Sequence, residues 1–343
     1  MKIKTVYIEI TNMCNLNCKT CYNQSGLNKI TKEISVKQIE NIILLFSKYG
    51  ASRFLFSGGE PTIHSQFEQL TQLIRKYPQF LFGMVTNGTT NNSNLVNLVN
   101  SLNNFTLQIS LDGSSEEENK LTRGIGNFDR VINFARRIKG NSKKLLKMVI
   151  SKANYKSVES FYKLALSLDF TPEFSFIYKS GNANDKWHEK CLTPQEKIQI
   201  ITQIKRLNSK YGIDAFLPKC TTNCTFLSDS AELSLCIKVD GSIQPCQSLY
   251  ESKYSLSNAF LFDENTFVEN LRLIQNIART RFSLDYGCKK CLINKICGKG
   301  CMAEASHLNN DPLSNDGNCE NRKLQFINCD LNYKDRIIVS DHS

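Results

Sequence analysis

Three cysteines near the N-terminus have the spacing of an iron–sulfur ligand set. Cys14, Cys18 and Cys21 follow one another as C-x3-C-x2-C, directly after an apolar run that is typical of a strand. Three thiolates on one short loop can bind three irons of a [4Fe–4S] cube, which leaves the fourth iron open to another ligand. A structural zinc site would need a fourth ligand, and the neighbouring sequence offers no further Cys or His. The pattern therefore favours a cluster with one open iron.

Polar motifs end three of the following strand-like runs. The second run ends in Gly58-Gly59-Glu60, whose glycines would let a ligand approach the backbone and whose carboxylate can bind an ammonium group. The third run ends in Thr-Asn-Gly at 86–88, and the fourth in Ser-Leu-Asp-Gly at 110–113, with Arg123 beyond it. The carboxyl ends of parallel strands share one edge, where α/β proteins carry their active sites. We therefore expect these motifs and the cysteine loop to form one site.

Most of the cysteines lie in the last third of the chain. Eleven of the 14 come from Cys191 onward, and the segment 288–319 is rich in loops and Cys. A run of this kind needs metal or disulfides to be ordered. The N-terminus has no apolar core followed by a cleavage site, so the sequence predicts no secretion signal and a cytoplasmic protein. Because the cytosol keeps thiols reduced, the cysteines indicate metal or redox chemistry.

The elements that would position these residues alternate along the first two thirds of the chain. Apolar runs predict strands, and apolar residues at three- and four-residue spacing predict helices between them. The expected strands are 5–10, 53–56, 81–86, 105–111, 145–151 and 173–178, and the expected helices are 36–49, 67–77, 95–102, 128–138, 158–168 and 194–211. Thr193 and Pro194 supply an N-cap and a first-turn proline, and Gly212 a helix end. Six β/α units indicate an α/β fold with a parallel sheet, either open or a partial barrel.

The regular alternation of predicted strands and helices ends after residue 212. We expect a domain at 1–212 and a smaller α+β domain at 213–343. The latter would hold a β-hairpin, 232–239 and 242–244, with a type I′ turn at Asp240-Gly241, and a helix at 263–282.

The amino-acid composition argues against two classes of partner, nucleic acid and the membrane. The net charge is +11, but the basic residues are scattered and indicate a solvated lysine-rich surface rather than a nucleic-acid site. The sequence has no run of 18 apolar residues, so a membrane span is not expected.

Taken together, these motifs resemble the radical S-adenosylmethionine (SAM) enzymes. The resemblance implies a partial (β/α)6 barrel of the TIM type, with a [4Fe–4S] cluster on Cys14, Cys18 and Cys21 whose open iron binds the amino and carboxylate groups of SAM. Reductive cleavage of SAM then gives a 5′-deoxyadenosyl radical that abstracts a substrate hydrogen. The family usually has an aromatic residue before the third Cys, where this chain has Thr20. The resemblance assigns SAM binding to Tyr22, Gly58, Gly59, Glu60, Asn87, Ser110, Asp112 and Arg123.

The C-terminal cysteines resemble the SPASM extension of the same superfamily, which usually holds two auxiliary [4Fe–4S] clusters. By this resemblance a distal cluster would be bound by Cys288, Cys291, Cys297 and Cys319. The proximal cluster would take Cys246, from Gly241-x4-Cys246, and Cys301. Cofactors are thus SAM and three [4Fe–4S] clusters.

Two further proximal ligands would come from three upstream candidates, Cys220, Cys224 and Cys236. Cys224 lies slightly too far before Gly241, and Cys236 too near. In a two-residue hairpin Leu235 would pair with Cys246, so that Cys236 faces the other way, which favours Cys220 and Cys224. A bulge would reverse this assignment, and a three-cysteine cluster open to substrate is an alternative. Cys191, Cys236 and Cys329 are left over, as buried thiols or as a hydrogen-atom donor to a substrate radical.

The resemblance implies a peptide or protein substrate and a flavodoxin- or ferredoxin-type electron donor. The predicted function is crosslinking, through thioether or C–C bonds, or epimerisation of a ribosomally made peptide. The barrel is expected to start near Met1, which leaves leader recognition to a separate protein or to the barrel surface, and the net charge would suit an acidic leader. The alternatives are a sulfatase-maturing enzyme, whose basic Asp is replaced here by Gln247, an amino-sugar dehydrogenase, and an electron-transfer scaffold.

Overall fold

A computed structural model describes residues 2–27, 30–215, 217–218, 224–229, 231–294 and 297–328. Nine strands form one curved sheet in the order β6-β5-β4-β3-β2-β1-β7-β8-β9. The first six strands run parallel. They are β1 (Lys2–Thr11), β2 (Arg53–Gly58), β3 (Leu81–Thr86), β4 (Phe105–Ser110), β5 (Lys143–Ile150) and β6 (Thr171–Phe176).

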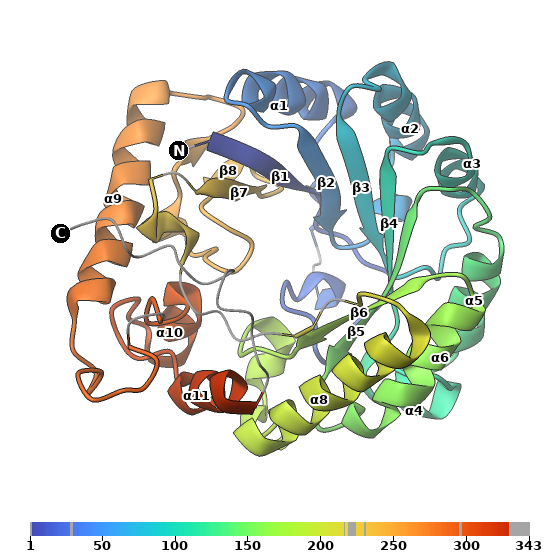
Figure 1. Ribbon diagram of the computed structural model, residues 1–343. Coiled ribbons are helices and arrows are strands. Elements are labelled where there is room, and N and C mark those ends of the chain that lie inside the picture. The colour runs from blue at the N-terminus through green and yellow to red at the C-terminus, as the bar shows by residue number, and fades with distance from the viewer. Residues whose placement is uncertain are drawn as a thin grey trace.

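Helices cover the outer face of this sheet (Figure 1). They are α1 (Val36–Lys48), α2 (Phe67–Lys76), α3 (Ser93–Ser101), α4 (Glu116–Arg123), α5 (Phe128–Arg136), α6 (Val158–Ser167), the short α7 (Trp187–Lys190) and α8 (Pro194–Tyr211). The six predicted strands and six predicted helices are all present, with ends shifted by a few residues. Sequence periodicity missed α4, whose eight residues include three consecutive glutamates. The N-cap prediction for α8 is confirmed: the Thr193 hydroxyl accepts from the Glu196 amide, and Gly212 ends the helix at a φ of 64°.

Alternate residues of each strand face opposite sides of the sheet. On β1, Val6, Ile8 and Ile10 are fully buried toward the helices, and Phe54 and Phe56 continue this core on β2. The residues between them, such as Tyr7 and Glu9, consequently face the barrel interior. The apolar layer therefore lies outside the ring of strands and leaves polar side chains inside it.

The C-terminal part continues the same sheet. β7 (Glu232–Ile237) pairs in parallel with β1, and β8 (Ser242–Gln244) and β9 (Ser257–Asn258) follow in antiparallel order. Figure 1 shows α9 (Glu264–Ser283) beside these strands, α10 (Met302–Asn309) below them and α11 (Cys319–Asn328) next to α8. The predicted loop-rich segment 288–319 thus contains α10. No helix in the described ranges is both long and apolar enough to cross a bilayer.

The hairpin between β7 and β8 differs from its prediction. Cys236 pairs with Gln244 and Ile237 with Ile243, so the loop holds three residues, 239–241, rather than two. The Gly241 amide donates to the Lys238 carbonyl oxygen, and Gly241 has a φ of 83°. A type I turn followed by a left-handed glycine makes such a loop, and it shifts the register by one residue. The predicted pairing of Leu235 with Cys246, which placed Cys236 on the opposite face from Cys246, is therefore wrong.

Candidate active site and cysteine clusters

The loop that carries Cys14, Cys18 and Cys21 leaves β1 at the carboxyl edge of the sheet. The pKa of the Cys14 thiol is raised to about 11, mainly by burial, with smaller contributions from the nearby charges of Glu60, Cys18 and Cys21. The three thiols therefore lie within electrostatic reach of one another. Within the described ranges no three His, Cys, Asp or Glu side chains surround a single ion site. A cluster does not require that arrangement, because each of its cysteines binds a different iron.

Gly58 and Gly59 hold this loop against the end of β2. The Gly59 amide donates to the Thr11 carbonyl oxygen at 2.8 Å, and the Glu60 amide donates to that of Met13 at 2.7 Å. A Cβ atom on Gly58 would lie 2.3 Å from the Thr11 oxygen, and one on Gly59 would lie 1.8 Å from the Met13 oxygen. The sequence explained the glycines by the approach of a ligand. In the structure it is the backbone of the cysteine loop that approaches them.

The Glu60 side chain ties the ends of β2 and β3 together. Its Oε1 accepts from the Thr62 amide and from the hydroxyls of Thr62 and Thr86, and its Oε2 accepts from the Asn87 amide at 2.7 Å. Burial raises the pKa of Glu60, and these four donors oppose that rise. Three of the four donors are on Oε1 and one is on Oε2, so Oε2 is the oxygen with room for a further donor.

Asn87 connects β3 to the cysteine loop. Its Nδ2 donates to Asn15 Oδ1 at 2.8 Å and lies 3.8 Å from Cys14 Sγ, while its Oδ1 accepts from the Thr89 amide and hydroxyl. The amide group thus orients the first cysteine of the predicted set.

Asp112 and Arg123 form a buried ion pair beside the same loop. Arg123 Nε lies 2.9 Å from Asp112 Oδ2, and the carboxylate also accepts from the Thr122 hydroxyl and the Val149 amide. The Arg123 charge lowers the pKa of Cys18, although burial dominates and raises it. Asp112 is thus engaged in holding Arg123 close to Cys18, and the predicted contact of Asp112 with SAM would have to replace one of these bonds. Ser110 ends β4 on the inner face of the sheet.

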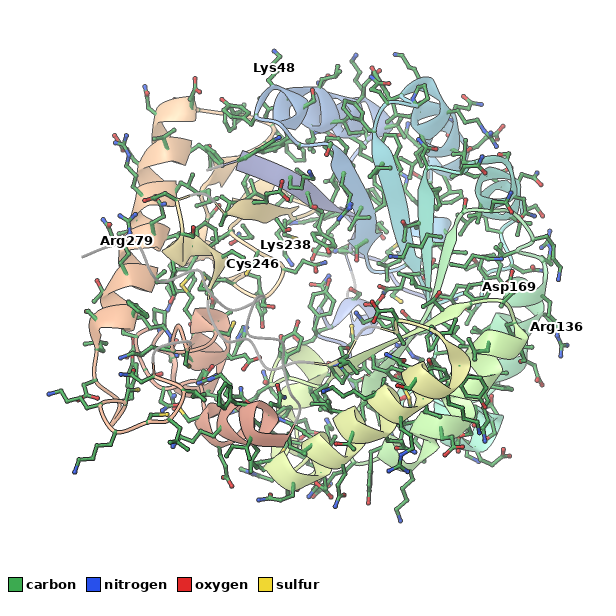
Figure 2. All side chains as sticks on the ribbon, viewed as in Figure 1. Lys48, Arg136, Asp169, Lys238, Cys246 and Arg279 are labelled. Atoms are coloured by element: carbon green, nitrogen blue, oxygen red, sulfur yellow. The ribbon has the colours of Figure 1, made fainter. Side chains whose placement is uncertain are left out.

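The barrel interior carries charged and thiol groups that the sequence interpretation did not single out as a site. Lys238 Nζ lies 2.9 Å from Glu9 Oε1, with side chains 18% and 5% exposed. Cys236 Sγ lies 4.0 Å from the same oxygen, and Lys238 also covers the Tyr250 ring. Figure 2 shows Lys238 toward the middle of the ring of strands, whereas Lys48 and Arg136 lie at its outer rim. Strand alternation could have found Glu9, because it stands between the buried Ile8 and Ile10.

Two further groups face the same interior. Lys147 of β5 pairs with Glu173 of β6 at 2.8 Å, both partly buried. The Tyr22 hydroxyl lies near Ser57 and Glu9, and burial raises its pKa well above the usual value. Tyr22 therefore points into the interior from the position next to Cys21.

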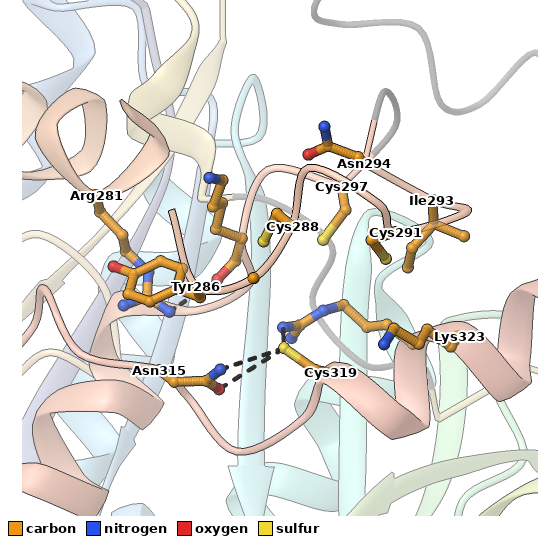
Figure 3. Close-up of a pocket in the computed structure, with 13 residues that line it drawn as sticks. Arg281, Tyr286, Cys288, Cys291, Ile293, Asn294, Cys297, Asn315, Cys319 and Lys323 are labelled. Atoms are coloured by element: carbon orange, nitrogen blue, oxygen red, sulfur yellow. Dashed lines mark hydrogen bonds between the residues drawn. The ribbon is translucent and has the colours of Figure 1, made fainter. Parts of the chain in front are cut away.

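The four predicted distal ligands come together. Cys288, Cys291, Cys297 and Cys319 line one cavity of about 120 Å³ (Figure 3). Its wall also includes the cationic side chains of Arg281, Lys299, Arg322 and Lys323. Four thiols around one cavity with positive charge nearby suit an anionic iron–sulfur cluster.

A second group of cysteines lies nearer the barrel. Burial is the main cause of the raised pKa values of Cys224 and Cys301, and the charge of the nearby Cys246 raises both further, as does Cys224 for Cys301. Burial raises the pKa of Cys224 to about 12. Thiols so buried need a metal to become thiolates. Cys220, the other predicted proximal ligand, and the spare Cys329 lie outside the described residues.

Two leftover cysteines have different surroundings. Cys236 faces the barrel interior and interacts with both Glu9 and Cys246. Cys191 lines a separate cavity of about 360 Å³ between β6, α8 and α10.

Comparison with known proteins agrees with this arrangement. The sequence profile of the Radical SAM superfamily matches residues 8–165. This part of the chain is a radical SAM domain. It contains the cysteine loop and every residue predicted to bind SAM.

Relatives of the radical SAM domain include maturation enzymes. The mycofactocin maturase MftC of Mycolicibacterium smegmatis is 26% identical over 194 residues, which are 56% of this chain and 49% of MftC. The alignment thus spans about half the length of that relative. The cysteine-type anaerobic sulfatase-maturating enzyme of Clostridium novyi is 24% identical over 325 residues, 84% of each chain.

Among solved structures, SuiB of Streptococcus suis with bound S-adenosylmethionine superposes with a TM-score of 0.74 at 16% identity. It covers 91% of this chain and 76% of SuiB. The superposition extends past the radical SAM domain into the cysteine-rich C-terminal part. The predicted fold, a partial barrel followed by a SPASM-type extension, is thereby confirmed.

Proposed function

We propose that this protein is a radical SAM enzyme that abstracts a hydrogen atom from a peptide and thereby crosslinks or epimerises it. The arrangement of the three-cysteine loop supports this most directly. The loop lies at the carboxyl edge of the barrel, is held by Gly58-Gly59-Glu60, and adjoins an interior that contains the Glu9–Lys238 and Lys147–Glu173 pairs. An electron carrier would need neither an open iron nor such an interior.

Cys14, Cys18 and Cys21 would hold the catalytic cluster. Bound there with SAM, a [4Fe–4S] cluster supplies an electron for reductive cleavage and so generates the hydrogen-abstracting radical. The chain's own residues fix the loop, exclude water and position the reactants. A flavodoxin- or ferredoxin-type protein would supply the electron.

Several groups at the strand ends are placed to bind SAM. Arg123, oriented by Asp112, would bind the SAM carboxylate, and the remaining acceptor position on Glu60 Oε2 would take the ammonium group. Asn87 would keep Cys14 in place. Ser110 and Tyr22 face the interior, where the nucleoside would lie, and Gly58 and Gly59 act through the cysteine loop.

The C-terminal part would hold two auxiliary clusters. The cavity lined by Cys288, Cys291, Cys297 and Cys319 fits the distal one. Cys224, Cys246 and Cys301 would bind the proximal one, with Cys220 as the fourth ligand. In the corrected hairpin register Cys236 pairs with Gln244, so the hairpin no longer excludes Cys236, which competes with Cys220 for the fourth position. Cys236 Sγ lies 4.0 Å from Glu9 Oε1, and this contact supports leaving Cys236 as a thiol outside the cluster.

A peptide substrate fits better than the alternatives for two reasons. MftC is named a maturase of mycofactocin, and SuiB has also been solved bound to a precursor peptide. A sulfatase-maturing role is the main alternative, because that relative aligns along most of both chains. However, Gln247 stands where that mechanism needs a carboxylate, and an amide cannot take up the proton.

The test is anaerobic incubation of the reconstituted protein with SAM, dithionite and candidate peptides encoded beside its gene, followed by mass spectrometry. Loss of two hydrogen atoms from a peptide indicates a crosslink. An unchanged mass in ordinary water, together with deuterium incorporation when the reaction is run in heavy water, indicates epimerisation. Conversion of a sulfatase-derived peptide to formylglycine, with the neighbouring peptides untouched, would contradict the proposal in favour of its alternative.

Replacement of Lys238 by Met should raise the KM for the peptide about tenfold, since a charge-assisted contact contributes roughly 1.5–3 kcal/mol. It should also lower the amount of modified peptide per 5′-deoxyadenosine. Lys48→Met, at the exposed end of α1, is the matched control and should change neither quantity.

The Lys238 variant leaves Glu9 buried without its partner, so its thermal stability should fall. The double variant Glu9→Gln/Lys238→Met should recover that stability but not the peptide KM. Recovery of both would show that the pair is structural only.

A further inference from the structure

The distal cysteine cavity is bordered by a buried ion pair that the sequence patterns did not reveal. Arg322 Nη1 lies 2.7 Å from Asp316 Oδ2, and Nη2 lies 2.9 Å from Oδ1, so the guanidinium and carboxylate meet through two parallel bonds. The side chains are 2% and 0% exposed. A buried pair of this geometry fixes the orientation of the guanidinium.

This pair reaches toward both auxiliary cysteine groups. Arg322 Nη2 also donates to Cys319 Sγ at 3.5 Å, and the Arg322 charge opposes the burial that raises the pKa of Cys297. On the other side, Asp316 Oδ2 accepts from the Cys301 amide at 3.0 Å. One guanidinium–carboxylate unit therefore connects a distal ligand to the backbone of a proximal ligand.

Gly300 makes room for the pair. A Cβ atom at this position would lie 2.0 Å from Asp316 Oδ2 and 2.3 Å from Arg322 Nη1. Gly300 also has a φ of 80°, which other residues rarely adopt. The glycine directly before Cys301 thus lets the ion pair pack against the ligand loop.

We propose that Arg322, oriented by Asp316, raises the reduction potential of the distal cluster. The inference rests on the proposed auxiliary clusters. A cluster with four thiolate ligands becomes more negative when it gains an electron, so a fixed cation and a hydrogen bond to a ligand sulfur favour its reduced form. The potential difference would direct electrons between the distal and proximal clusters.

Other cations around the cavity are less suited to this role. Arg281 donates to the backbone carbonyl oxygens of Pro312, Ser314 and Lys299. Lys323 lines the same cavity but is exposed, so water screens its charge. Lys323 therefore offers a matched control at the neighbouring position.

The experiment is a redox titration of the reconstituted full chain, followed by electron paramagnetic resonance and compared with iron content. Cys319→Ala identifies the distal signal as the one it removes. Arg322→Gln should lower the equilibrium constant for one-electron reduction of the distal cluster about tenfold, which is about 59 mV. Lys323→Gln should change it less than threefold. An unchanged distal potential in an iron-replete Arg322→Gln protein would overturn the inference.

If Arg322→Gln loses the distal iron, Arg322→Lys tests the inference in its place. Its single ammonium cannot keep both bonds to Asp316 and the bond to Cys319, so the same constant should fall about threefold, and an unchanged value would overturn the inference. Failure of the proposed clusters is distinguishable: wild-type protein would then lack the signal that Cys319→Ala removes.

Discussion

Replacement of Cys14 by Ala should abolish formation of 5′-deoxyadenosine and reduce bound iron by about four atoms per chain, leaving about eight. Loss of one of only three ligands leaves the catalytic cluster with two, while the C-terminal cysteines are unaffected because they lie on other segments. The measurement is product formation with SAM and dithionite, combined with iron and sulfide analysis of the reconstituted protein.

Cys191→Ala is the matched control, because Cys191 lines a different cavity whose wall contains none of the predicted cluster cysteines. It should retain both iron and SAM cleavage. Cleavage by Cys14→Ala at even a hundredth of the wild-type rate would contradict the assigned ligand set.

Replacement of Gly59 by Ala should have an effect almost as large. The new Cβ would lie 1.8 Å from the Met13 carbonyl oxygen, a distance that only movement of the cysteine loop can relieve. The loop would then lose its hydrogen bonds to the amides of Gly59 and Glu60. We expect incomplete catalytic cluster assembly and at least a hundredfold loss of SAM cleavage, measured as in the previous experiment.

Gly126→Ala is the control variant, because it introduces backbone strain without the steric crowding expected for Gly59→Ala. Gly126 has a φ of 75° and open space around its Cα, so Ala there should cost about 1–2 kcal/mol of stability without loss of the cluster. Equal SAM cleavage by the two variants would show that the contact between Gly59 and the loop does not matter.

The sequence predicted the barrel well because its local patterns and its tertiary packing agree. On β1 and β2 the alternation of apolar and polar residues matches the burial of Ile8, Ile10 and Phe56. The cysteine spacings were equally informative: Cys288, Cys291, Cys297 and Cys319 do line one cavity.

The features that the sequence did not predict depend on how segments pack and pair in three dimensions. The helix α10 has only eight residues and little amphipathic pattern. The three-residue hairpin loop was missed because Asp240-Gly241 suits a two-residue turn equally well. The parallel pairing of β7 with β1 connects segments more than 200 residues apart, and it brings Lys238 to Glu9. A contact between segments so far apart leaves no signal in a single sequence. The pairing of Asp316 with Arg322, although these residues are close in sequence, leaves none either.

Iron and acid-labile sulfide analysis of the anaerobically reconstituted wild-type chain tests the central claim most directly. The account predicts about 12 iron atoms and 12 sulfides per chain, with four of each lost from Cys14→Ala and a different four lost from Cys319→Ala. About four iron atoms per chain, all removed by Cys14→Ala, would contradict the account, because the C-terminal cysteines would then bind no cluster.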